Sequence, residues 1–187
     1  TLNGIFFRYE SKNTDVYSFN YKNDNDWKFE QATLRKNILY IAGGGHVGIA
    51  LCKVFSLLDF YIIIYDNRKE LKKKYSELFA DKIIIDSFSD LGKSVEDDSY
   101  IVIVTSGYES DKEALMQVIG RNVKYIGLMG TKAKVKKIFS ELRREGISDN
   151  FTDKIHAPVG IDINSNTPEE IAVSIAAEII REKNKDH

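Results

Sequence analysis

Cysteine and long apolar runs are what this sequence of 187 residues has least of. The single cysteine, Cys52, excludes an internal disulfide and any metal site built from several thiolates. Because Cys52 falls within an apolar segment, we expect a buried and unreactive thiol. No uninterrupted apolar run reaches the roughly 18 to 20 residues that cross a bilayer, and the first residues do not form a signal peptide pattern. These absences predict a cytoplasmic protein without a membrane span.

An excess of charge of one sign is also missing. The 27 basic and 28 acidic residues leave a net charge of -1, which gives no electrostatic reason to expect nucleic acid as a partner. Three histidines without cysteine support are too few for a convincing metal site, and no serine stands in a G-x-S-x-G elbow. We therefore name no catalytic residue and no metal ligand. With 43% hydrophobic residues, the chain can still bury a sizeable core.

The sequence is organised around a glycine cluster that joins a strand-like run to a helix-like run. Residues 38–42 are apolar, an apolar segment of helix length lies beyond the cluster, and between them stand Gly43, Gly44, Gly45, His46, Val47 and Gly48. The first, third and last of these fit G-x-G-x-x-G in the context that gives the pattern meaning. Such glycines allow an unusual backbone conformation, the approach of a phosphate and close helix packing. We predict a site for a phosphate-bearing ligand, with His46 either facing that ligand or capping the loop.

Strands and helices alternate from this point on. Short β-branched runs predict strands at residues 38–42, 61–65, 82–85, 100–104 and 124–128, with helices at 47–58, 69–79 and 111–119. This series predicts an α/β fold, a Rossmann-like doubly wound parallel sheet whose first and fourth strands are neighbours. We assign this Rossmann-like domain to residues 37–187.

An aromatic segment, residues 1–36, precedes this domain. Alternating residues at 17–21 and 27–29, on either side of a polar turn, predict a β-hairpin. A lone hairpin is only marginally stable. We therefore expect the segment, a remnant or a dimer contact, to pack on the main domain, on a further domain or on a second copy of the chain. A homodimer is the expected assembly.

Ligands of a doubly wound sheet bind outside the carboxyl ends of the strands, where the strand order reverses. This rule adds Thr105, Ser106 and Gly107, which follow the fourth strand. Asp66 ends the second strand, where a carboxylate can accept hydrogen bonds from a ribose diol. There Asp66 would disfavour a 2′-phosphate, although the positive charge of the nearby Arg68 weakens that preference. The alternative is that Asp66 caps a turn.

Further candidates lie in the C-terminal third. Gly130 and Thr131 follow the fifth strand and can hold a second phosphate, but we favour the alternative that Thr131 is the N-cap of a solvated basic helix. Thr167 begins a capping box for a last, well-buried helix. Within that helix Ser174 and Glu178 share a face, for which we favour contact with solvent over contact with a polar cavity.

Five stretches occur in an order that resembles a known family. They are GGGHVG at 43–48, DNR at 66–68, YIGLMGT at 125–131, HAPVGIDI at 156–163 and TPEEIAVSIAAEI at 167–179. Together they resemble the C-terminal Rossmann domain of the XdhC/CoxI family, the xanthine dehydrogenase accessory factors, over about residues 38–180. The resemblance implies a maturation factor that binds molybdenum cofactor (molybdopterin) and supports its sulfuration with a cysteine desulfurase. It also implies delivery of the cofactor to a xanthine dehydrogenase-type molybdenum hydroxylase.

The sequence departs from the family pattern at two points. Family members usually carry an N-terminal domain with its own glycine-rich and often cysteine-bearing motifs, whereas only the hairpin-like segment stands before residue 37 here. The family also usually has T-H-x-x-x-x-D after the fourth strand. In this sequence Ser106 takes the place of that histidine, between Thr105 and Asp111. A ligand-binding role of the histidine therefore cannot be transferred to this chain.

Three hypotheses about function remain open on the sequence. The first is a non-catalytic carrier or insertion factor for molybdenum cofactor, and it is the one we favour. The second is an NAD(P)-dependent oxidoreductase that uses the glycine turn and Asp66. The third is a degenerate assembly module that has lost its ligand and contacts a partner protein through the aromatic segment.

Overall fold

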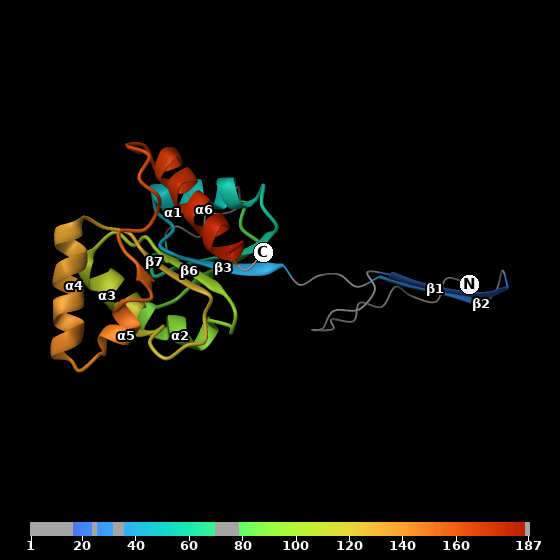
Figure 1. Cartoon of the computed structure of the whole chain (residues 1–187), viewed down its shortest axis with the longest axis horizontal. Coiled ribbons are helices and arrows are strands. Elements are labelled where there is room, and N and C mark those ends of the chain that lie inside the picture. Colours follow the sequence, from blue (N-terminus) through green and yellow to red (C-terminus); the bar gives the residue numbers. More distant parts are fainter. Residues whose placement is uncertain (1–16, 24–25, 32–35, 70–78, 186–187) are drawn as a thin grey trace. The chain divides into compact units, whose positions relative to one another are not determined.

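A computed structural model describes residues 17–23, 26–31, 36–69 and 79–185 (Figure 1). The chain divides into two units, Thr1–Lys36 and Asn37–His187. In the first unit, β1 (Tyr17–Asn23) and β2 (Asp26–Gln31) pair antiparallel. This pairing confirms the predicted hairpin.

The second unit is built on a six-stranded sheet in which every pairing is parallel. Its strand order is β5-β4-β3-β6-β7-β8, so β3 lies between β4 and β6 as the sequence predicts. The strands are β3 (Asn37–Ala42), β4 (Phe60–Asp66), β5 (Lys82–Ile85), β6 (Tyr100–Ile103), β7 (Tyr125–Leu128) and β8 (Ile155–His156). The fold is the predicted Rossmann-like one. The sequence missed β8, because two residues provide no apolar run to recognise.

Helices cover both faces of this sheet (Figure 1). They are α1 (His46–Phe55), α2 (Leu91–Ser94), α3 (Tyr108–Met116), α4 (Lys132–Arg144), α5 (Asp149–Thr152) and α6 (Pro168–Lys183), with a short 3₁₀ turn η3 (Phe88–Asp90). Two predicted helices are displaced: α1 ends before residue 58, and α3 begins and ends three residues before the predicted bounds. The predicted helix at 69–79 lies almost wholly outside the described residues. No helix in the described ranges is both long and apolar enough to span a membrane.

Two hydrophobic clusters explain why the strands are apolar along their whole length. Leu39 and Ile41 face the layer of α1 and α6, whereas Tyr40 and Ala42 face the layer of α3 and α4. Successive side chains of one strand thus enter opposite clusters, as expected for a parallel sheet covered on both faces. This burial fixes the carboxyl end of β3, from which the glycine turn begins.

The capping box predicted for the last helix is present. The Thr167 hydroxyl accepts a hydrogen bond from the Glu170 N–H, and the Glu170 carboxylate accepts one from the Thr167 N–H. These two bonds satisfy donors that the first turn of a helix leaves unpaired. They fix the start of α6, which packs against α1.

Candidate functional site

The glycine turn between β3 and α1 uses its three pattern glycines in three different ways. Gly43 has a φ of +115°, and a Cβ on it would lie 2.5 Å from the Val104 carbonyl oxygen. A Cβ on Gly48 would lie 2.0 Å from the Gly43 carbonyl oxygen. A Cβ on Gly45 would meet no heavy atom within 4 Å. Gly43 and Gly48 are thus required by the fold, whereas Gly45 borders open space.

A cleft of about 370 Å³ opens beside this turn at the carboxyl ends of the strands. Seven of the predicted ligand-binding residues line it: Gly44, Gly45, His46, Val47, Arg68, Thr105 and Ser106. Three residues that the sequence analysis did not name, Ile49, Val104 and Met129, line it as well. Because β3 and β6 are neighbours, their carboxyl ends bring the glycine turn and the Thr105 loop together.

Asp66 and Arg68 form an ion pair at the side of the cleft. Asp66 is 1% exposed, and its Oδ2 accepts hydrogen bonds from the Gly44 N–H at 2.7 Å and from Arg68 Nη2 at 2.8 Å. Its Oδ1 accepts from the backbone N–H and Nε of Arg68, both at 2.9 Å. The cleft is therefore lined by the arginine, with the carboxylate behind it. Binding of a ribose diol by Asp66 stays a prediction.

The charge state of Asp66 follows from these contacts. Burial by itself would raise the pKa of this carboxyl group. The hydrogen bonds from Arg68 and Gly44 outweigh burial and hold the pKa of Asp66 below its ordinary value. Asp66 is therefore ionised at neutral pH and anchors the glycine turn to the end of β4.

A second buried carboxylate supports the wall formed by Thr105. Asp111 is fully buried on α3, and its Oδ1 accepts hydrogen bonds from the Thr105 hydroxyl at 2.5 Å and the Thr105 N–H at 3.2 Å. The Lys134 ammonium from α4 pairs with its other oxygen. Burial raises the pKa of Asp111 even against the opposing effect of Lys134 and Thr105. The sequence predicted a solvated basic helix, and that prediction is only partly correct, because Lys134 of α4 pairs with the buried Asp111.

The remaining predicted residues lie at helix starts around the cleft. His46 is the first residue of α1 and lines the cleft, while Gly45 is the N-cap. Gly107 is the N-cap of α3. Thr131 is the N-cap of α4 and accepts a hydrogen bond from the Lys134 N–H at 3.2 Å, which confirms the favoured alternative for its side chain. A ligand-binding role for Gly107, Gly130 and Thr131 stays a prediction.

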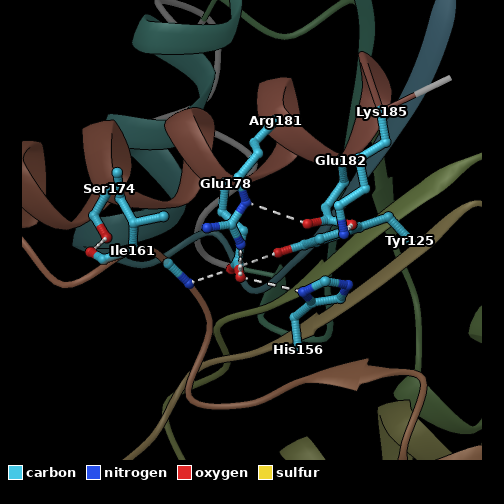
Figure 2. A network of polar contacts seen from close by, with 9 residues as sticks. Tyr125, His156, Ile161, Ser174, Glu178, Arg181, Glu182 and Lys185 are labelled. Carbon is cyan, nitrogen blue, oxygen red and sulfur yellow. Dashed lines mark hydrogen bonds and ion pairs between the residues drawn. The ribbon is translucent and has the colours of Figure 1, made fainter. Parts of the chain in front are cut away.

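A third buried carboxylate is Glu178 on α6, whose polar contacts are drawn in Figure 2. Glu178 does not line the cleft. Its Oε2 accepts hydrogen bonds from the Tyr125 hydroxyl at 2.9 Å and from the Gly160 N–H at 2.6 Å. Its Oε1 lies 3.2 Å from His156 Nδ1, and the His156 ring stacks on the Tyr125 ring. Ser174 is buried too, and its hydroxyl donates to the Ile161 carbonyl at 2.6 Å. The solvent-facing interpretation of Ser174 and Glu178 is wrong, because both bind the backbone of the loop after β8.

The chemistry of the cleft suits an anion. Its described lining residues include the Arg68 guanidinium, the His46 imidazole, the Ser106 hydroxyl and the first N–H groups of α1, and none of these residues is acidic. The positive end of the helix dipole adds to this potential. Ile49, Val104 and Met129 provide an apolar side, so the ligand that fits has an anionic end and a flat or apolar remainder.

A family model and several known proteins are similar to this chain. The family model, described as the XdhC Rossmann domain, matches residues 39–179, which lie within the second unit. YqeB, an uncharacterized protein of Escherichia coli strain K12, is 33% identical over 151 residues, which cover 78% of this chain and 27% of YqeB. A protein of Bacillus subtilis strain 168, named as a probable subunit of xanthine dehydrogenase, is 32% identical over 84 residues, covering 45% of this chain and 23% of that protein.

A solved structure resembles the chain over a larger share. The crystal structure of a xanthine dehydrogenase from Bacillus halodurans aligns with a TM-score of 0.71 at 27% identity, over 86% of this chain and 46% of that one. The chain thus spans about a quarter of the two curated relatives and about half of the solved one. The likeness is therefore to a part of these longer proteins.

Proposed function

This chain belongs to the XdhC family of Rossmann domains, and from that membership we propose that it binds molybdenum cofactor in the cleft beside its glycine turn. In this proposal it is an accessory factor that assists sulfuration of the cofactor and its insertion into a xanthine dehydrogenase-type molybdenum hydroxylase. The hydroxylase and a cysteine desulfurase are its proposed partners. The relative from Bacillus subtilis, named as a probable part of xanthine dehydrogenase, supports the association with such an enzyme.

The observation that carries the proposal is Gly45. Its φ of -78° is open to any residue, and a Cβ there would meet nothing within 4 Å. Neither backbone conformation nor internal packing therefore requires glycine at this position. A ligand that approaches the backbone gives the missing reason, and the helix start behind Gly45 favours a phosphate.

The residues of the cleft fit such a cofactor. In the proposal, the N–H groups around Gly45 and the Arg68 guanidinium hold its phosphate, and the Ser106 hydroxyl meets polar atoms of its pterin. Met129 and Ile49 shield the ring from water. When bound, the cofactor supplies the molybdenum centre that a hydroxylase requires.

Binding of NAD(P) is the second candidate, because the three pattern glycines meet the steric roles of a dinucleotide turn. It differs from the first candidate in its ligand and not in the residues of the site. This candidate therefore rests on the binding of the dinucleotide alone.

The test is cofactor retention by Gly45→Val against a matched control. The purified chain is incubated with molybdenum cofactor released from a hydroxylase, separated from free cofactor, and assayed for molybdenum and the fluorescent pterin oxidation product. We expect both in the native chain, and at least a tenfold loss in Gly45→Val, whose side chain fills the open space at the turn. Lys136→Ala, an exposed change on α4, is the control and should retain the cofactor. Equal retention by the two variants, or none by the native chain, contradicts the proposal.

A further inference from the structure

Lys134 on α4 connects the loops that follow β6 and β7. Its side chain is 24% exposed, and its ammonium group pairs with the fully buried Asp111 of α3. The same ammonium group donates a hydrogen bond to the Met129 carbonyl oxygen at 3.3 Å. Lys134 therefore joins the buried acid of α3 to the chain segment directly after β7.

Asp111 continues this connection to the loop after β6. Its Oδ1 accepts hydrogen bonds from the hydroxyl and the backbone N–H of Thr105, while Lys134 pairs with its Oδ2. Thr105 and Met129 both line the cleft, and they follow neighbouring parallel strands. One lysine thus links two lining residues that lie on different loops.

The path of the Lys134 side chain explains a glycine beside the cleft. A Cβ on Gly130 would lie 2.9 Å from Lys134 Cδ, and the φ of Gly130 is not positive. The backbone conformation therefore does not require glycine at this position. Instead, the lysine stem occupies the space that a side chain would need. Gly130 and Lys134 together bring the ammonium group to Asp111 and Met129.

We propose that Lys134 is a positioning residue of the cleft and holds the Thr105 loop and the Met129 loop at the separation that the bound cofactor needs. Lys134 itself does not line the cleft, so it acts through the residues that it holds. A ligand binds more tightly when the groups around it are already fixed, because less entropy is lost on binding. The inference rests on the proposed function, since molybdenum cofactor is the ligand whose retention it concerns.

The alternative is that Lys134 only compensates the charge of Asp111. A buried carboxylate without its cation is strongly destabilising, so loss of the lysine alone lowers stability under either interpretation. Removal of both charges separates the two. If Lys134 only compensates charge, a neutral pair restores stability and cofactor retention together. If Lys134 positions the loops, a neutral pair restores stability but not retention.

The experiment compares Lys134→Met with the double variant Lys134→Met/Asp111→Asn and with Lys136→Met. Lys136 is the matched control, because it is an exposed lysine of the same helix. Each full chain is incubated with molybdenum cofactor released from a hydroxylase, separated from free cofactor and assayed for molybdenum and the pterin oxidation product. Thermal unfolding of the same samples measures their stability.

We expect Lys134→Met to lower both the unfolding midpoint and the cofactor retention. The double variant should recover most of the lost midpoint, yet retain about tenfold less cofactor than the native chain, because the two loops are no longer joined. Lys134→Arg, which keeps the positive charge, should retain more cofactor than Lys134→Met. Lys136→Met should equal the native chain in both measurements.

Native-level retention by the double variant overturns the positioning role of Lys134 and leaves the proposed function intact. The same conclusion follows if Lys136→Met loses as much cofactor as Lys134→Met. If the native chain retains no cofactor, the proposed function fails, and the positioning role fails with it.

Discussion

Asp66 and Glu178 are two buried carboxylates that perform the same local task in different surroundings. Each accepts a hydrogen bond from a glycine N–H, Gly44 at 2.7 Å and Gly160 at 2.6 Å. Each also pairs with an arginine a few residues further along the chain. A charged acceptor is a strong partner for a backbone N–H, so each acid fixes the path of a loop that follows a strand.

The neighbouring atoms distinguish the two regions. Beside Gly44, the open position at Gly45 leads into the cleft. Gly160 itself is enclosed, because its φ is +101° and a Cβ on it would lie 2.3 Å from the Ser174 hydroxyl oxygen. One carboxylate therefore holds a loop beside the cleft, and the other holds a loop against a helix. A buried acid on a glycine N–H does not by itself indicate a binding site.

Substitutions at the two carboxylates test this comparison, and we expect the largest loss of stability from a change at Glu178. Glu178→Ala leaves the buried Tyr125 hydroxyl and the Gly160 N–H without their acceptor, which we expect to cost about 3–5 kcal/mol in the free energy of unfolding. Urea unfolding followed by circular dichroism measures it. Glu178→Gln keeps one acceptor oxygen and should lose less. A loss below about 1 kcal/mol for Glu178→Ala would show that these hydrogen bonds do not hold the loop at Gly160 against α6.

The corresponding change at the cleft should affect stability less and binding more. Asp66→Asn removes the charge that anchors Arg68 and Gly44 but keeps one acceptor oxygen, so we expect a cost of about 1–3 kcal/mol. Cofactor retention should fall at least tenfold, because the glycine turn loses its anchor at the end of β4. The retention assay on this variant and on Glu178→Gln tests the difference. If both variants retain the cofactor equally well, the proposed division between the two regions is wrong.

The sheet and the glycine turn were predictable, because both depend on signals within a few neighbouring residues. Apolar β-branched runs gave the five longer strands, and the G-x-G-x-x-G spacing gave the turn at Gly43. Helix ends were less accurate: α3 begins at Tyr108 because Gly107 adopts an extended conformation that serves as the N-cap. The two-residue strand β8 has no local signal, since it forms only by pairing with β7.

The polar networks were not predictable in the same way, because they join residues far apart in the sequence. Glu178 binds Tyr125 across 53 positions, and its isolation in an apolar helix is equally consistent with a solvent-facing residue. The sequence indicated that Lys134 is one of several exposed lysines, whereas in the structure it pairs with the buried Asp111 of α3. The place of Asp66 at the end of a strand was predicted correctly, but the direction of Arg68, which lines the cleft in front of Asp66, was not. That direction depends on side-chain geometry, which a spacing pattern does not contain.

The pH dependence of stability provides a smaller test of the Asp66 contacts. The pKa of Asp66 is lower in the folded protein than the ordinary 3.8, so ionised Asp66 stabilises the fold above pH 3.8. That contribution is lost as the pH falls from 3.8 through the lower folded-state pKa. The stability advantage of the native chain over Asp66→Asn should therefore stay constant between about pH 7 and 5 and shrink only below about 4. Urea midpoints of both proteins across this range measure the advantage, and a decline that begins at about pH 6 would assign it to another group.

The smallest effect is expected from Arg181, and it completes the comparison between the regions. The Arg181 side chain is 56% exposed and its Nη2 lies 3.3 Å from Glu178, whose other oxygen keeps the hydrogen bonds from Tyr125 and Gly160. Solvent screens such a pair, so Arg181→Ala should cost about 0.5 kcal/mol or less. Arg68→Ala should cost more, because each oxygen of the buried Asp66 loses one side-chain donor, although Asp66 keeps the hydrogen bonds from the Gly44 N–H and from the backbone N–H of residue 68. Parallel urea titrations of the two variants measure the difference. If Arg181→Ala is the more destabilising variant, Glu178 depends on Arg181 for charge compensation. The difference between the two carboxylates proposed here would then be wrong.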